Sequence, residues 1–103
     1  TALNQFRPYL ALTDAFLLFK FTIENNFFKN DIYNALSENY TVNQILNKIK
    51  RYKRNISVKF VSSPIMNQLS HHVDKNKINK EGFFFRNKIG TDIKNTLNLL
   101  KNL

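Results

Sequence analysis

The chain of 103 residues contains no cysteine, no tryptophan, two glycines and two prolines. Without cysteine it can form neither a disulfide framework nor a thiolate for metal binding or nucleophilic catalysis. Gly82 and Gly90 are too isolated to form a glycine-rich phosphate loop. The longest apolar stretch, Tyr9–Phe21, contains two charged residues and is shorter than the roughly 20 residues that span a bilayer. We therefore expect no membrane partner.

The remaining composition is that of a folded protein with a hydrophobic core. Hydrophobic residues make up 43% of the chain and aromatic residues 14%, which argues against disorder. The length fits one domain over residues 1–103, with no repeat or linker. The chain begins at Thr1, which we expect to reflect processing or truncation. Asn, Lys, Phe, Ile and Tyr, whose codons are AT-rich, dominate the sequence and indicate a very AT-rich genome, such as that of an organelle, a protist or a reduced bacterium.

Positive charge is confined to the second half of the chain. The formal net charge is +9, with −1 over residues 1–47 and +10 over residues 48–103. Six basic residues and no acid fall between Lys48 and Lys59: Lys48, Lys50, Arg51, Lys53, Arg54 and Lys59. A localised basic surface is typical of a polyanion-binding protein. A merely solvated lysine-rich surface is the alternative, but codon bias alone would have enriched lysine in both halves.

The pattern of apolar residues predicts an α+β fold with the order β-α-β-β-α. Alternation predicts strands at residues 16–23, 56–61 and 83–86, the last continuing towards Ile89. A turn is expected at 24–26, a short helix at 31–39, and an irregular basic loop at 66–82. Pro64 is expected to end or bulge the second strand. A last helix is expected to start at Thr91 or Asp92, either of which can serve as its N-cap.

The clearest predicted element is a helix that follows Thr41. Thr41 and Gln44 have the spacing of a capping box, in which each side chain accepts a hydrogen bond from the other residue's backbone. Apolar residues then recur at helical spacing: Val42, Ile45, Leu46, Ile49 and Tyr52. The basic residues from Lys48 to Arg54 occupy the rest of this helix. We therefore expect one face to pack against the protein and the other to be positive.

Two other segments are candidates for function. Phe83–Arg86 is interpreted as a buried strand, with Phe83 and Phe85 facing the helices and Phe84 and Arg86 opposite, although aromatic residues on a sheet can also stack unpaired bases. His71, His72 and Asp74 form the only cluster that resembles a metal or catalytic site. Adjacent histidines rarely reach one ion, and no third His or Cys completes a zinc site. We favour a loop pair that contacts phosphate or packs locally.

Several short blocks resemble the ribosomal small-subunit protein S-ten family. Val61–Ile65 resembles its V-S-G-P-I stretch, Ser70–Lys75 its S-P-H-V-D-K, and Glu81–Arg86 its E-Q-F-E-I-R. Asp92-Ile93 matches a following D-I, and Ile45–Arg54 resembles the family's first helix. The resemblance covers about residues 16–100. It implies a ferredoxin-like split β-α-β sandwich with a shortened central hairpin at Met66–Leu69 and without the family's last strand.

The resemblance implies a structural constituent of the small ribosomal subunit, in a divergent mitochondrial member of the family. Its partners would be small-subunit ribosomal RNA and neighbouring ribosomal proteins, with no catalysis, cofactor, metal or small-molecule substrate. The six bases from Lys48 to Lys59 would neutralise phosphates. A second group along the loop and sheet edge would extend this contact: His72, Lys75, Lys77, Lys80 and Arg86.

Two other classes of function remain open on the sequence. A secreted effector or adaptor from an AT-rich bacterium would use the same basic surface to bind acidic host proteins. An enzyme would have to rest on His71, His72 and Asp74.

Overall fold

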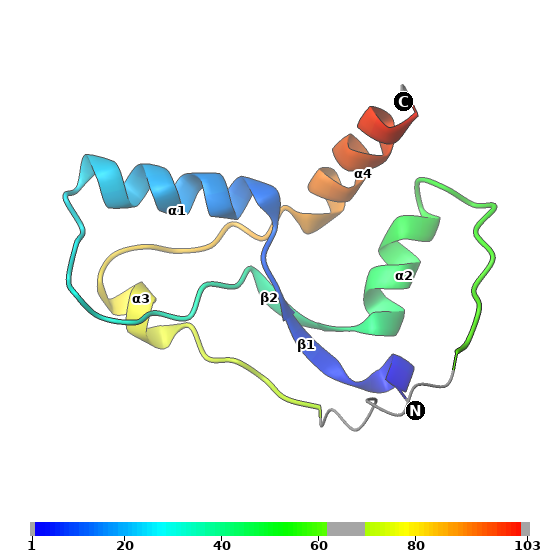
Figure 1. Ribbon diagram of the computed structural model, residues 1–103, viewed down its shortest axis with the longest axis horizontal. Helices are drawn as coiled ribbons and strands as arrows, with labels where there is room; N and C mark the ends of the chain where they lie inside the picture. The colour runs from blue at the N-terminus through cyan, green and yellow to red at the C-terminus, as the bar shows by residue number, and fades with distance from the viewer. Residues whose placement is uncertain (1, 62–69, 102–103) are drawn as a thin grey trace.

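A computed structural model describes residues 2–61 and 70–101 of the chain. In order, they form a 3-10 helix η1 (Ala2–Asn4), strand β1 (Phe6–Tyr9), helix α1 (Leu12–Glu24), strand β2 (Glu38–Thr41), and helices α2 (Val42–Lys50), α3 (Asn76–Lys80) and α4 (Ile89–Leu100) (Figure 1). The α+β class predicted from the sequence is confirmed. Pro64 and the shortened hairpin at Met66–Leu69 lie outside the described residues.

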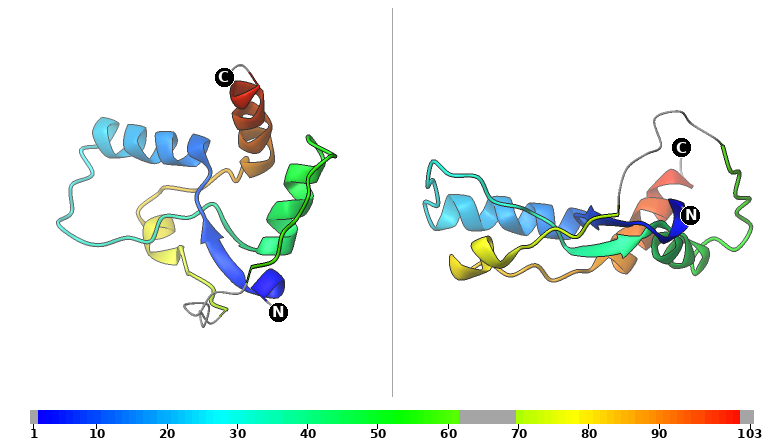
Figure 2. Two further views of the ribbon diagram at one scale, coloured as in Figure 1. Left: turned by 45° about the vertical axis from the view of Figure 1, so that its right-hand side comes forward. Right: turned by 90° about the horizontal axis from the view of Figure 1, so that it is seen from below.

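The molecule is flat, with principal extents of 45 × 36 × 19 Å. The two strands cross its middle, α1 and α3 lie on one side of them, and α2 and α4 lie on the other (Figures 1 and 2). The strands are antiparallel and pair Phe6 with Thr41 and Tyr9 with Glu38. Because α1 lies between β1 and β2 in the chain, this sheet is a long-range pairing and not a hairpin.

The predicted strand at residues 16–23 is wrong, because these residues belong to α1. Both faces of this helix are apolar. Its inner face packs Phe21 against Phe27 and Phe83, at ring-centroid distances of 5.4 and 5.3 Å. Its outer face carries four apolar side chains that are 65–73% exposed: Leu12, Phe16, Phe19 and Ile23. With apolar residues on every side, alternation over eight residues could not distinguish a strand from a helix.

The other two predicted strands and the short helix are also wrong. Residues 56–61 and 83–86 are irregular, and β2 begins inside the range 31–39 that was predicted to be helical. A strand needs a neighbour for its backbone groups. At the end of the segment 83–86, the N–H groups of Arg86 and of the following Asn87 instead donate to the side chain of Asp14, at 2.8 and 3.0 Å. The ferredoxin-like arrangement is therefore not confirmed.

Two predictions that rest on local chemistry are confirmed. The Thr41 hydroxyl accepts from the Gln44 N–H at 3.1 Å, and the Gln44 side chain accepts from the Thr41 N–H at 2.8 Å, so the capping box starts α2. The turn after α1 contains Asn26 at a φ of 50°, in the left-handed region that asparagine tolerates.

The start of α4 differs from the prediction. The helix begins at Ile89, after Lys88, and no side chain caps it. Asp92 instead accepts hydrogen bonds from the backbone N–H and the hydroxyl of Thr13, at 2.8 and 2.6 Å. Thr13 lies in the first turn of α1, where helical N–H groups lack intrahelical acceptors. Asp92 therefore caps a different helix from the one it was expected to cap.

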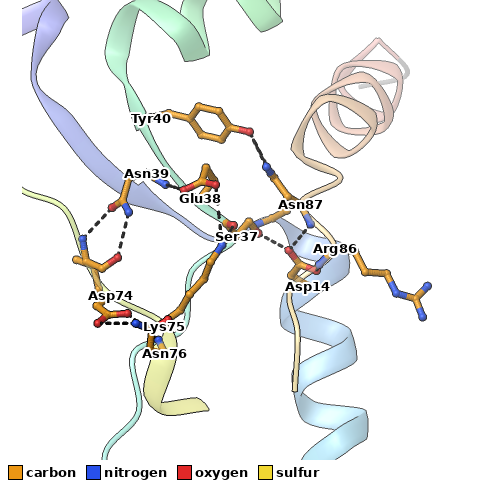
Figure 3. Close-up of polar contacts among 12 residues, drawn as sticks. Asp14, Ser37, Glu38, Asn39, Tyr40, Asp74, Lys75, Asn76, Arg86 and Asn87 are labelled. Carbon is orange, nitrogen blue, oxygen red and sulfur yellow. Dashed lines mark hydrogen bonds and ion pairs between the residues drawn. The ribbon is translucent and has the colours of Figure 1, made fainter. Parts of the chain in front are cut away.

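A buried carboxylate lies where the segments converge. Asp14 and Ser37 are both 0% exposed. The Ser37 hydroxyl donates to Asp14 at 2.5 Å and accepts from the Ala11 N–H at 2.8 Å (Figure 3). Asp14 also accepts from the backbone N–H groups of Arg86 and Asn87. Its carboxylate therefore joins α1 to the residue before β2 and to the segment before α4.

Truncation of Phe83 should destabilise the protein, whereas truncation of Phe84 should not. Phe83 is 6% exposed and packs edge-on against Phe85 at 4.9 Å, while Phe84 is 67% exposed, so the predicted alternation of faces is confirmed. We expect Phe83→Ala to lower the free energy of unfolding by about 3–5 kcal/mol. Phe84→Ala, the matched control, should change it by no more than about 0.5 kcal/mol. Urea denaturation followed by circular dichroism measures both.

Removal of the Asp14 carboxylate should unfold the protein or nearly so. In Asp14→Ala three donors lose their buried acceptor, each at a cost of about 1–3 kcal/mol, out of a total stability of about 5–15 kcal/mol. Asp74→Ala is the control, because that carboxylate is exposed and accepts from the backbone N–H and the side-chain amide of the nearby Asn76. A thermal midpoint equal to wild type in Asp14→Ala would show that this junction does not hold the fold.

Candidate polyanion-binding surface

The predicted basic helix is present in part, because α2 ends at Lys50 and only two of the five basic residues predicted on it lie within it. Lys48 and Lys50 lie in the last turn, Arg51 follows as the C-cap residue, and Lys53 and Arg54 continue beyond it, exposed. Ile45, Leu46 and Ile49 are half-buried on the opposite side, whereas Val42 and Tyr52 at the ends of the predicted stripe are exposed. Cations near the C-terminus of a helix also complement its dipole.

Helices α2 and α4 lie on the same side of the two strands (Figure 1). Between the end of α2 and α4 is a cleft of about 540 Å³, which we call the α2–α4 cleft. It is lined by Tyr52, Lys53, Arg54, Asn55, Lys94, Leu97, Asn98, Leu100 and Lys101. Two cations come from each side, and we call Lys53, Arg54, Lys94 and Lys101 the four cleft cations. None of the described residues that line the cleft is acidic. Positive charge is therefore concentrated on both walls of one concave surface.

The contribution of α4 to this cleft was not predicted from the sequence. A signal was available, because Lys94 and Lys101 are seven residues apart, with Leu97 and Asn98 between them, and therefore share one helical face. The only acid in α4, Asp92, is bonded to Thr13 of α1 and does not line the cleft. The sequence does not show that α4 packs beside α2. It therefore gave no reason to place Lys94 and Lys101 in the same surface as the basic residues that follow Lys48.

The basic surface continues along α2 beyond the cleft. The Lys48 ammonium lies 5.0 Å from the centroid of the Tyr40 ring, a cation–π distance. Tyr40, Lys48 and Arg51 contribute to a smaller hollow of about 220 Å³ on the surface of α2. Lys59, Lys80 and Arg86 are exposed elsewhere on the molecule, and the Arg86 guanidinium points away from Asp14 (Figure 3).

Two of the lysines predicted to contact phosphate are already paired within the protein. The Lys75 ammonium donates to the Ser37 carbonyl at 2.8 Å and lies 4.0 Å from Glu38. The Lys77 ammonium lies 2.9 Å from Asp31 and donates to the Ile32 carbonyl at 2.8 Å. The hydrogen bond from Lys77 lowers the pKa of Asp31 below its usual value. These lysines contribute to the fold and are not part of the cleft.

The histidine pair lies beside β1. The His72 ring packs against Phe6 with centroids 4.3 Å apart, and the His71 N–H donates to the Phe6 carbonyl at 3.3 Å. The Asp74 carboxylate accepts from the Asn76 N–H at 2.7 Å, at the start of α3. Within residues 2–61 and 70–101, no three histidine, cysteine, aspartate or glutamate side chains form a group that could hold a metal ion.

Loss of a cleft cation should weaken polyanion binding more than loss of a paired lysine. Lys53→Gln and Lys77→Gln each remove one positive charge, but Lys77 is held by Asp31 and a carbonyl. We expect Lys53→Gln to elute from immobilised heparin at clearly lower salt than wild type and Lys77→Gln to elute close to wild type. Equal shifts for the two variants would mean that net charge, and not the cleft, determines retention.

In the part of the chain that the structure describes, no helix is long and apolar enough to cross a membrane. Comparison of the chain with protein families, with curated proteins and with solved structures gives no significant match.

Proposed function

We propose that this protein is a non-catalytic RNA-binding protein that uses the α2–α4 cleft and the adjoining basic face of α2 as its interface. One observation supports this most: cations more than 35 residues apart in the sequence come together in an acid-free cleft. Holding like charges together has an electrostatic cost, which a bound polyanion relieves.

The chemistry of the interface fits the nucleic-acid backbone. Phosphates are contacted mainly by arginine and lysine, and such contacts position a protein without reading sequence. Arg54 can contact a phosphate with two parallel hydrogen bonds, whereas the three lysines of the cleft act as point charges. Arg51 and Lys50, exposed on the neighbouring surface of α2, extend the positive potential along a bound strand.

A narrower proposal rests on the sequence resemblance. The blocks at residues 61–65, 70–75 and 81–86 support a role as a structural constituent of the small ribosomal subunit, in contact with its RNA and with neighbouring ribosomal proteins. The ferredoxin-like arrangement and the mitochondrial location belong to this narrower proposal and stay predictions. Co-sedimentation of the protein with small subunits after a high-salt wash tests it; release into the supernatant would contradict it.

RNA binding should depend steeply on salt and on the cleft. If the four cleft cations neutralise four phosphates of a single strand, the logarithm of the binding constant should fall with log[salt] at a slope of about −3. Lys53→Glu combined with Arg54→Glu should abolish binding at 150 mM salt, because two attractive contacts become repulsive. Fluorescence anisotropy of a labelled RNA measures both effects.

The matched control is Lys20→Glu with Lys29→Glu, which changes the net charge equally on and after α1, away from the cleft. Circular dichroism should show that both double variants keep the helical content of wild type. The proposal is wrong if the folded Lys53→Glu/Arg54→Glu variant binds RNA as wild type does. Binding to an acidic polypeptide such as polyglutamate, without binding to RNA, would instead favour the adaptor function.

A further inference from the structure

We infer that the α2–α4 cleft accommodates an unpaired nucleotide of the RNA, with its base against Tyr52 and its flanking phosphates on the four cleft cations. This inference rests on the proposed RNA-binding function and specifies the form of RNA that the site accepts: a single strand or loop, and not a duplex.

The first reason is that the cleft is not purely cationic. Tyr52 and Leu100 lie among the charged residues and are 43% and 55% exposed, and Leu97 also lines the cleft. Contacts with phosphates alone do not require an exposed aromatic ring or an exposed leucine. Bases that leave a helix stack on aromatic side chains, and they cover apolar surface when they do so.

The second reason is the shape of the site. Its volume of about 540 Å³ lies within the range of roughly 300–1,000 Å³ that small-molecule pockets occupy. A duplex cannot insert a base into this cavity, because its bases are paired and stacked and only their edges are accessible in the grooves. A single strand can place one base in the cavity while the neighbouring phosphates remain at the rim, where cations from both walls can reach them.

The third reason is the polar chemistry at the same place. The Asn55 amide, in the exposed segment after α2, lines the cleft and can both donate to and accept from a base edge. A side chain with both capacities suits a base edge, which presents donors and acceptors, better than it suits a phosphate, which only accepts. The cleft thus combines a stacking surface, a hydrogen-bonding group for a base and cations for the backbone.

The test compares two RNAs: a 12-nucleotide strand without self-complementarity, and the duplex that it forms with its complement. Fluorescence anisotropy at one fixed salt concentration gives both dissociation constants for each protein. We expect wild type to bind the single strand about 5- to 150-fold more tightly than the duplex, from the usual contribution of one stacked base. Tyr52→Ala should lose this preference and keep its affinity for the duplex.

The controls separate stacking from charge and from misfolding. Tyr52→Phe keeps the ring and should keep the preference, while Lys94→Glu with Lys101→Glu should weaken binding to both RNAs. Leu100→Asn, at the exposed end of α4, should reduce the preference without changing the circular dichroism spectrum. The Leu100→Asn variant tests the apolar wall of the cleft independently of Tyr52.

The outcomes distinguish this inference from the proposed function. Equal affinity of wild type for the two RNAs, or a preference that survives Tyr52→Ala, would overturn the unpaired-nucleotide site and leave RNA binding intact. Failure of wild type to bind either RNA would overturn the proposed function, and the inference with it.

Discussion

The buried Asp14 carboxylate is the interaction on which the arrangement of the molecule depends. A carboxylate without solvent exposure is tolerated only when its oxygens accept hydrogen bonds, and Asp14 accepts from Ser37, Arg86 and Asn87. These donors come from the residue before β2 and from the segment before α4, while Asp14 itself lies in the first turn of α1. A flat molecule with a two-stranded sheet has few other places where three segments can be joined.

The same junction positions the proposed interface. Asn87, at a φ of 55°, turns the chain into α4 and also donates from its side chain to the Tyr40 hydroxyl at 2.8 Å. Tyr40 in turn lies beneath the Lys48 ammonium of α2. Together with the bond from Thr13 to Asp92, these contacts set where α4 lies relative to α2. Residues outside the α2–α4 cleft therefore contribute to its geometry, besides the direct contacts between the two helices.

The structural features that could be predicted from the sequence are those that depend on residues close together in the chain. The capping box at Thr41 and the alternation of Phe83 and Phe84 come from local spacing and are confirmed, while the basic helix is confirmed only as far as Lys50. Strands depend on a partner elsewhere in the chain. β1 and β2 are four residues each and lack a strong alternating pattern, whereas 56–61 alternates but is irregular. Their pairing follows from tertiary contacts that no local pattern contains.

The features of the candidate site likewise divide into those that the sequence predicts and those that only the fold determines. The run of bases after Lys48 was visible because charge is a property of single residues. Which of these charges remain available for a partner cannot be predicted from single residues, because it depends on the fold. Lys75 and Lys77 are paired with acids about 40 residues earlier in the chain. Lys94 and Lys101, in contrast, line the same cleft as Lys53 and Arg54. Folding thus compensates some cations and gathers others on an acid-free surface. It is the gathered cations, and not the densest stretch of basic sequence, that should determine where a polyanion binds.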